Sequence, residues 1–162
     1  MFWYSILIDT VLIGIIFYGG ILLMVKVNPR SQLHNYPPEI QKVVPKKNKY
    51  DKKIFNIIAI PTLILLFLYI VLSSKYWFSG TAITYKSFLI RWVIINTILA
   101  IFDLFVLDYF LFCTITPKFF IISGTEGNPG YKNKSYHTKT IPQMIPVVLI
   151  SSMLFSLTFF II

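Results

Sequence analysis

Four long apolar stretches run along the chain, separated by segments that hold most of its charged residues. A helix needs about 20 mostly apolar residues to cross the hydrocarbon core of a bilayer. Stretches of that kind cover residues 2–25, 54–72, 88–114 and 141–162. Residues 54–72 carry no charge on any face, whereas a helix of a soluble protein keeps one polar face. We therefore predict an all-α membrane protein, with residues 1–162 forming a single domain of four transmembrane helices in an antiparallel bundle.

The bulk composition supports a bilayer environment. Charged residues make up 13% of the chain, about half the share of an ordinary soluble domain, which is roughly 25%. The strands of a transmembrane β-barrel would alternate apolar and polar residues over about 10 positions, and the four stretches do not alternate in this way. Abundant Ile, Lys and Asn are typical of an AT-rich bacterial genome, so we expect the plasma membrane of a bacterium.

The basic residues predict the orientation of the helices. Of the 15 Lys and Arg, eight lie within residues 26–53 and four within 118–139, whereas only three lie around the intervening connection. Because cytoplasmic loops carry the excess of basic residues, these two long loops should be cytoplasmic and both termini extracytoplasmic. We interpret the net charge of +9 as favouring contact between these loops and anionic lipid headgroups. Nucleic acid is not expected as a partner, because the Lys and Arg residues lie between the apolar stretches, where they would face lipid headgroups.

Three polar residues inside the predicted spans form a first candidate site. Asp9, Asn96 and Asp103 are costly in hydrocarbon, so each needs a functional or structural reason. Asp9 and Asp103 are interpreted either as a proton or cation relay or as a structural pair that bonds across a helix interface. Asn96 lies seven residues before Asp103 and should share its face. Arg91 is interpreted as an interfacial base whose head group reaches the membrane surface, with an ion pair to Asp9 as the alternative.

A second candidate site lies where the two basic loops meet the third helix. Asp108 is five residues after Asp103, so in an α-helix the two carboxylates point about 140° apart and cannot line one narrow seam. Asp108 should instead lie near the cytoplasmic headgroups, beside polar side chains of both loops. The guanidinium of Arg30 suits a pair of phosphate oxygens. This site comprises Arg30, His34, Tyr36, Asp108, Glu126 and His137.

Other chemistries receive little support from the sequence. His34 and His137 lack the spacing of a zinc site, so neither a metal nor a cofactor is predicted. Cys113 is interpreted as a small buried hydrophobic residue. The glycine-rich run 123–130 lacks the lysine of a phosphate-binding loop and is interpreted as a flexible turn.

Three classes of function remain open, and an enzymatic activity is neither predicted nor excluded. The leading hypothesis is an accessory membrane protein whose loops dock a partner, either a second copy of the chain or a larger membrane protein. The first alternative is a site at the level of the cytoplasmic headgroups that binds or processes a lipid-like or phosphorylated ligand. The second alternative is a small proton- or cation-coupled transporter subunit that uses Asp9 and Asp103.

Overall fold

The computed structural model describes residues 1–161, and within them the chain forms helices and turns with no strand. Four helical segments are long and apolar enough to cross a membrane, which confirms this part of the prediction. They are α1 (Phe2–Val27), α3 (Lys49–Phe78), α4 (Tyr85–Phe102) with its direct continuation η2 (Asp103–Ile115), and α6 (Ile141–Ser156) with its continuation η5 (Leu157–Ile161).

Local sequence signals explain where some of these helices begin. The side chain of Asn48 accepts a hydrogen bond from the Asp51 amide at 2.8 Å, and Asp51 accepts one from the Asn48 amide at 2.9 Å. This reciprocal capping box starts α3 five residues before the predicted position 54. Thr84 caps α4 through the amide of Ser87. Pro61 lies within α3 without ending it.

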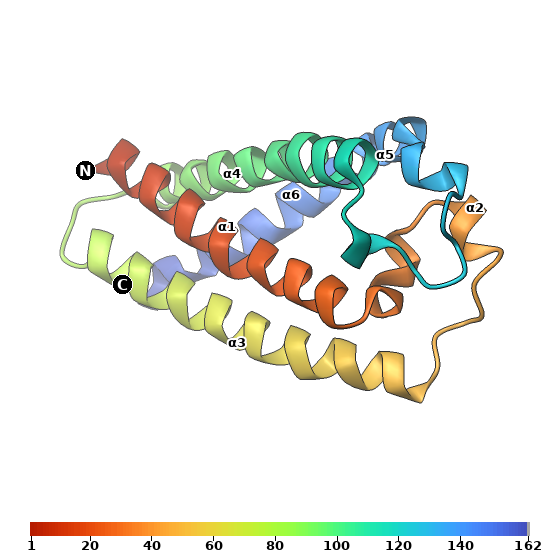
Figure 1. The fold of residues 1–162 in the computed structure, drawn as a ribbon. Coiled ribbons are helices and arrows are strands. Elements are labelled where there is room, and N and C mark those ends of the chain that lie inside the picture. Colours follow the sequence, from red (N-terminus) through yellow and green to blue (C-terminus); the bar gives the residue numbers. More distant parts are fainter. Residues whose placement is uncertain (162) are drawn as a thin grey trace.

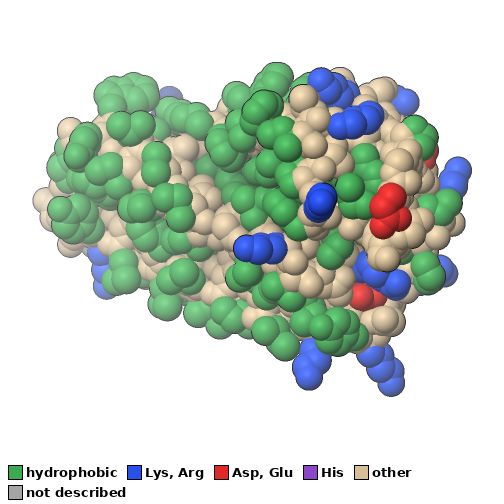
Figure 2. Space-filling view, in the orientation of Figure 1, with side chains coloured by type: hydrophobic (Ala, Val, Ile, Leu, Met, Phe, Trp, Pro, Cys, Tyr) green, Lys and Arg blue, Asp and Glu red, His purple; other side chains and the backbone are tan. Residues whose placement is uncertain are grey.

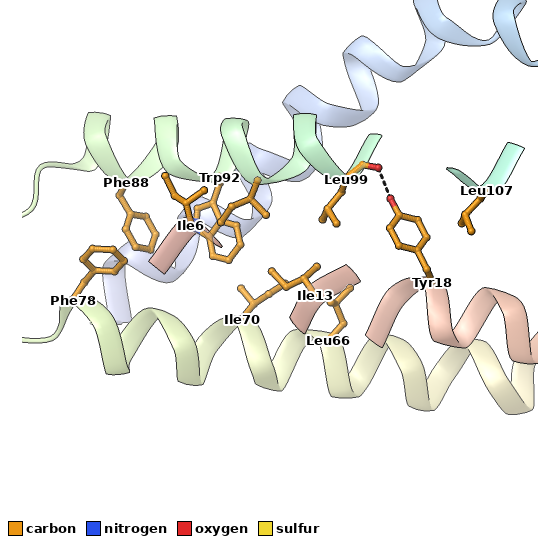
Figure 3. Close-up of a cluster of buried hydrophobic side chains, with 11 residues drawn as sticks. Ile6, Ile13, Tyr18, Leu66, Ile70, Phe78, Phe88, Trp92, Leu99 and Leu107 are labelled. Carbon is orange, nitrogen blue, oxygen red and sulfur yellow. Dashed lines mark hydrogen bonds between the residues drawn. The ribbon is translucent and has the colours of Figure 1, made fainter. Parts of the chain in front are cut away.

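The long helices pack around α1. In Figure 1, α1 lies between α3 and α4, and α6 lies against α4. The main apolar core lies between them, with Trp92, Phe88 and Ile70 almost fully buried. Figure 3 shows that this core draws side chains from α1, α3 and α4. The bundle is therefore held by the packing of α1 against α3 and α4, of α6 against α4, and of η5 against α3.

The two long connections fold together at one end of the bundle, and we call residues 28–48 and 116–140 the loop cap. Its short helices are η1 (Pro29–Asn35), α2 (Pro38–Gln41), η3 (Lys118–Phe120), η4 (Pro129–Lys132) and α5 (Lys134–Lys139). A second apolar core joins the two connections to the end of η2. The Tyr36 hydroxyl donates to the Phe120 carbonyl across them at 2.9 Å. The loop cap is thus a folded structure rather than a pair of free linkers.

Charge is concentrated at this end of the molecule. In Figure 2 the Lys and Arg side chains gather mainly over the half that carries the loop cap, and hydrophobic side chains cover much of the opposite half. N and C, marked in Figure 1, lie toward the hydrophobic half.

Candidate functional site

A cavity of about 720 Å³ lies between the long helices and reaches the loop cap. A volume of this size is typical of small-molecule sites, which span roughly 300–1,000 Å³. Most of the lining is apolar and comes from α1, α3, η2 and α6. The polar lining residues are Tyr18, Asn35, Asn96, Asp103, Asp108, Tyr136, His137, Thr140, Gln143 and Ser151.

The backbone form of η2 brings two carboxylates to this cavity. Residues Asp103–Ile115 form a π-helix, in which hydrogen bonds join residues five apart. The amide of Thr116 accordingly bonds to the Leu111 carbonyl at 2.9 Å. Asp103 and Asp108 are also five apart, and both line the cavity. The separation of 140° predicted for an α-helix does not apply to this π-helical backbone. π-Helical segments occur frequently at functional sites.

His137 joins the π-helix to the loop cap. Its Nδ1 lies 2.9 Å from a carboxylate oxygen of Asp108, and its ring packs edge-on against Phe112 with the centroids 5.4 Å apart. The side chain is only 6% exposed. Its other nitrogen, Nε2, is buried and has no hydrogen-bond partner within the described chain. A buried polar atom without a hydrogen-bond partner in the protein is rare in folded proteins.

The remaining polar groups mostly present acceptors. Asn96 uses its amide nitrogen to donate to the Trp92 carbonyl at 2.9 Å and to Ser152 at 3.2 Å, leaving its oxygen as an acceptor. Asp103 makes no side-chain hydrogen bond or ion pair within residues 1–161. Figure 3 shows the Tyr18 hydroxyl already donating to the Leu99 carbonyl, at 2.5 Å.

Tyr136 supplies a hydroxyl at the loop-cap end of the cavity. Burial and the nearby Asp108 carboxylate raise the pKa of Tyr136, so the phenol keeps its proton at neutral pH. No lysine or arginine belongs to the described cavity lining. The two carboxylates and His137 are therefore the only Asp, Glu, Lys, Arg or His side chains in the described lining.

Four of the six residues expected at the loop–helix junction lie outside the cavity. Arg30 forms an ion pair with Asp51 at 3.2 Å and donates to the Pro45 and Lys46 carbonyls. Tyr36 is buried within the loop cap, and burial raises the pKa of its hydroxyl.

His34 and Glu126 make local contacts within the loop cap. His34 Nδ1 lies 2.8 Å from the Lys47 ammonium, and partial burial together with this ammonium lowers the pKa of His34. Glu126 accepts the amide of Gly124 at 2.9 Å. Among the predicted residues, the cavity therefore brings together Asp108 and His137 from one candidate set with Asn96 and Asp103 from the other.

Asp9 belongs to a separate cluster in the bundle. Its carboxylate is fully buried and pairs with Arg91, and it accepts hydrogen bonds from Ser73 and Tyr69 at 2.7 Å. The expectation that Arg91 reaches the membrane surface was wrong. A buried carboxylate and three aromatic rings surround its guanidinium, the nearest being Trp92 with its centroid at 4.5 Å. Asp9 is absent from the described cavity lining and makes no contact with Asp103.

Residue patterns do not single out Tyr136, Gln143 or Ser151 as lining residues, because their positions depend on how α5 and α6 pack. No group of three or more His, Cys, Asp or Glu suited to a metal occurs within residues 1–161. Comparison of the chain with protein families, curated proteins and solved structures gives no match.

Proposed function

We propose that this protein is a multi-pass plasma-membrane protein that binds a lipid-like ligand in the cavity between its helices. In this proposal the helices form an antiparallel bundle with both termini extracytoplasmic, and the loop cap lies at the cytoplasmic headgroups. The gathering of Lys and Arg over the loop cap supports this orientation, because cytoplasmic loops carry the excess of bases and attract anionic lipids.

The observation that carries the proposal is the division of the cavity into an apolar body and a polar end. Side chains such as Leu63, Phe67 and Val147 line the body, whereas Asp108 and His137 lie where η2 meets the loop cap. An amphipathic ligand matches such a division, because its chain replaces lipid contacts while its head group meets polar side chains. The bilayer supplies ligands of this kind directly.

Two other functions receive less support. A relay between Asp9 and Asp103 would need both carboxylates on one polar path, yet Asp9 is held by Arg91, Ser73 and Tyr69. A phosphorylated ligand would need bases in the cavity, and Arg30 is engaged by Asp51 outside it. Docking of a partner by the loop cap is compatible with ligand binding and stays a hypothesis.

A cavity-filling substitution tests the proposal. Val148 lines the cavity, whereas the adjacent Leu149 is exposed on the outer surface of α6 and serves as the matched control. The protein, the variant Val148→Trp and the control Leu149→Trp would be reconstituted in nanodiscs of phosphatidylethanolamine and phosphatidylglycerol. Native mass spectrometry after release then counts the lipids retained on each.

We expect wild type and Leu149→Trp to retain a lipid under conditions that strip Val148→Trp. An indole ring occupies the space that an acyl chain would use, so the loss should be specific to the cavity position. Equal retention by all three proteins, with all three folded by circular dichroism, would contradict the proposal.

A further inference from the structure

We infer that the head group of the ligand is a primary or secondary ammonium, held by Asp103, Asp108 and the Nε2 of His137. This inference rests on the proposed function and specifies its ligand. Its geometric basis is twofold. The polar end of the cavity holds two carboxylates and no lysine or arginine, and the buried Nε2 atom of His137, a lining residue, has no hydrogen-bond partner within the described chain.

The charges of the cavity favour a cation. The whole chain carries a net charge of +9, yet its described lining holds two aspartates and no lysine or arginine. The neutral His137 ring donates to Asp108 through Nδ1 and carries no charge, so neither carboxylate of the described lining has a lysine or arginine opposite it. A carboxylate buried in a membrane without a counter-charge is costly, and a bound ammonium supplies that charge.

The imidazole of His137 favours a head group that also donates hydrogen bonds. When Nδ1 donates its proton to the acceptor-only carboxylate of Asp108, the neutral ring presents Nε2 as an acceptor. That atom is buried and has no partner in the described residues. Together with the Asp103 and Asp108 carboxylates it forms a set of acceptors on the cavity. A primary ammonium offers three N–H donors to such a set, whereas a quaternary ammonium offers none.

Two sources could deliver this chemistry: a membrane lipid with an amine head group, or a free long-chain amine that partitions into the bilayer. The cavity volume of about 720 Å³ is in the range of drug-sized ligands. A single chain with its amine therefore fits inside, while a two-chain lipid would leave part of its tails among the surrounding lipids.

The test measures binding of four dodecyl probes to the purified full chain in a nonionic detergent by isothermal titration calorimetry. The probes share one alkyl chain and carry a primary amine, a trimethylammonium, a phosphate or a hydroxyl group. The protein variants are Asp103→Asn and His137→Asn, with Glu126→Gln as the control, because Glu126 is acidic and lies outside the cavity. Thermal unfolding confirms that each variant is folded.

We expect the primary amine to bind at least about tenfold more tightly than the trimethylammonium probe, and the phosphate to bind weakest. Asp103→Asn should weaken amine binding about ten- to hundredfold, as loss of a charge-assisted hydrogen bond predicts. His137→Asn should reduce the preference for the primary over the quaternary amine, which a general loss of packing would not do. Glu126→Gln should bind as wild type does.

Competition with vesicles separates the two sources. Displacement of dodecylamine by phosphatidylethanolamine, but not by phosphatidylcholine with the same acyl chains, supports the inference with a lipid as ligand. Dodecylamine binding that neither lipid displaces supports it with a free amine as ligand.

The inference is overturned if dodecyl phosphate binds as tightly as the amine, if dodecylamine does not bind, or if Asp103→Asn leaves amine affinity unchanged. If the lipid retained in nanodiscs is still lost in Val148→Trp, the proposed lipid site stands and only the identity of its head group is wrong.

Discussion

Asp9 on α1 and Arg91 on α4 form an ion pair whose two side chains are both completely shielded from solvent. Ser5 receives a further hydrogen bond from Arg91, and Ser73 of α3 donates to Asp9. Three of the four long helices therefore meet at one charged contact. A buried pair adds little net stability over a hydrophobic replacement, but removing one partner leaves the other charge uncompensated.

The first prediction concerns this pair. Asp9→Asn leaves the guanidinium of Arg91 buried without its counter-charge, and we expect it to lower the free energy of unfolding by about 3–5 kcal/mol. The double variant Asp9→Asn with Arg91→Met should recover much of that loss, since no buried charge remains. Chemical unfolding in detergent, followed by circular dichroism, measures both. A double variant less stable than Asp9→Asn alone would show that the pair is not the source of the loss.

The second prediction concerns the close approach of α1 and α3. A Cβ atom added at Gly20 would lie 2.6 Å from the Cγ2 atom of Thr62, whereas one added at the adjacent Gly19 would meet nothing within 4 Å. Alanine stabilises an exposed helical position by about 1 kcal/mol relative to glycine. Gly19→Ala should therefore raise the unfolding temperature, while Gly20→Ala should lower it through overpacking, at a cost of about 1–3 kcal/mol.

Thermal unfolding of the two variants side by side checks this prediction. Because both substitutions add one methyl group to the same helix, the propensity gain is common to them and only the contact with Thr62 differs. Adding Thr62→Ser to Gly20→Ala removes the methyl group that is nearest to the new Cβ atom, so it should restore part of the loss. An unfolding temperature for Gly20→Ala equal to that of Gly19→Ala would show that α1 and α3 do not approach so closely.

The sequence predicts the four spans well because length and hydropathy are local properties that a bilayer imposes. Charge and spacing also brought Asp103, Asp108 and His137 forward as candidates. Their convergence depends on two features that residue patterns do not encode. One is the π-helical backbone of η2, and the other is the folding of the two connections onto each other through contacts such as Tyr36 with Phe120. The ion pair of Arg91 with Asp9 was only the alternative interpretation of the sequence, because the aromatic rings around Arg91 come together through helix packing.

The third prediction is a pH dependence that arises in the loop cap. Partial burial and the Lys47 ammonium lower the pKa of His34 below its ordinary value of 6.5. The unfolded chain therefore binds a proton at His34 more readily than the folded chain. Stability from this group is present above pH 6.5 and is lost as the pH falls from there through the lowered pKa. The variant His34→Gln should show a smaller decrease in unfolding temperature between pH 7.5 and 5.5 than wild type.

Lys47→Gln provides a second test of the cause. This variant removes the ammonium that lies 2.8 Å from His34, so the unfolding temperature should decrease less between pH 7.5 and 5.5 than in wild type. Burial of His34 remains in this variant and should keep part of the decrease. Lys42→Gln, which removes a charge at an exposed position of the same connection, should keep the slope of wild type. A slope unchanged in His34→Gln would assign the pH dependence to other groups.

The fourth prediction concerns the attachment of α5 to the bundle. Six residues are too few for a helix to be stable alone, and α5 is held to η2 by His137 with Asp108 and by Thr138 with Tyr109. Asp108→Asn weakens the first contact, so the segment should unfold more often and make the backbone at the exposed Lys134 and Lys139 accessible to trypsin. Loss of a partly exposed hydrogen bond worth about 1 kcal/mol corresponds to roughly fivefold faster cleavage when opening limits access.

Asp103→Asn is the matched control for this effect, because Asp103 lines the same cavity and has no hydrogen bond or ion pair to α5 among the described residues. Its cleavage rate at Lys134 and Lys139 should equal that of wild type, as measured by mass spectrometry of the peptides released from proteoliposomes. If both variants are cleaved faster to the same extent, the cavity carboxylates stabilise the bundle in common and His137 is not the link. If only Asp108→Asn is affected, the hydrogen bond between His137 and Asp108 holds the loop cap over the polar end of the cavity.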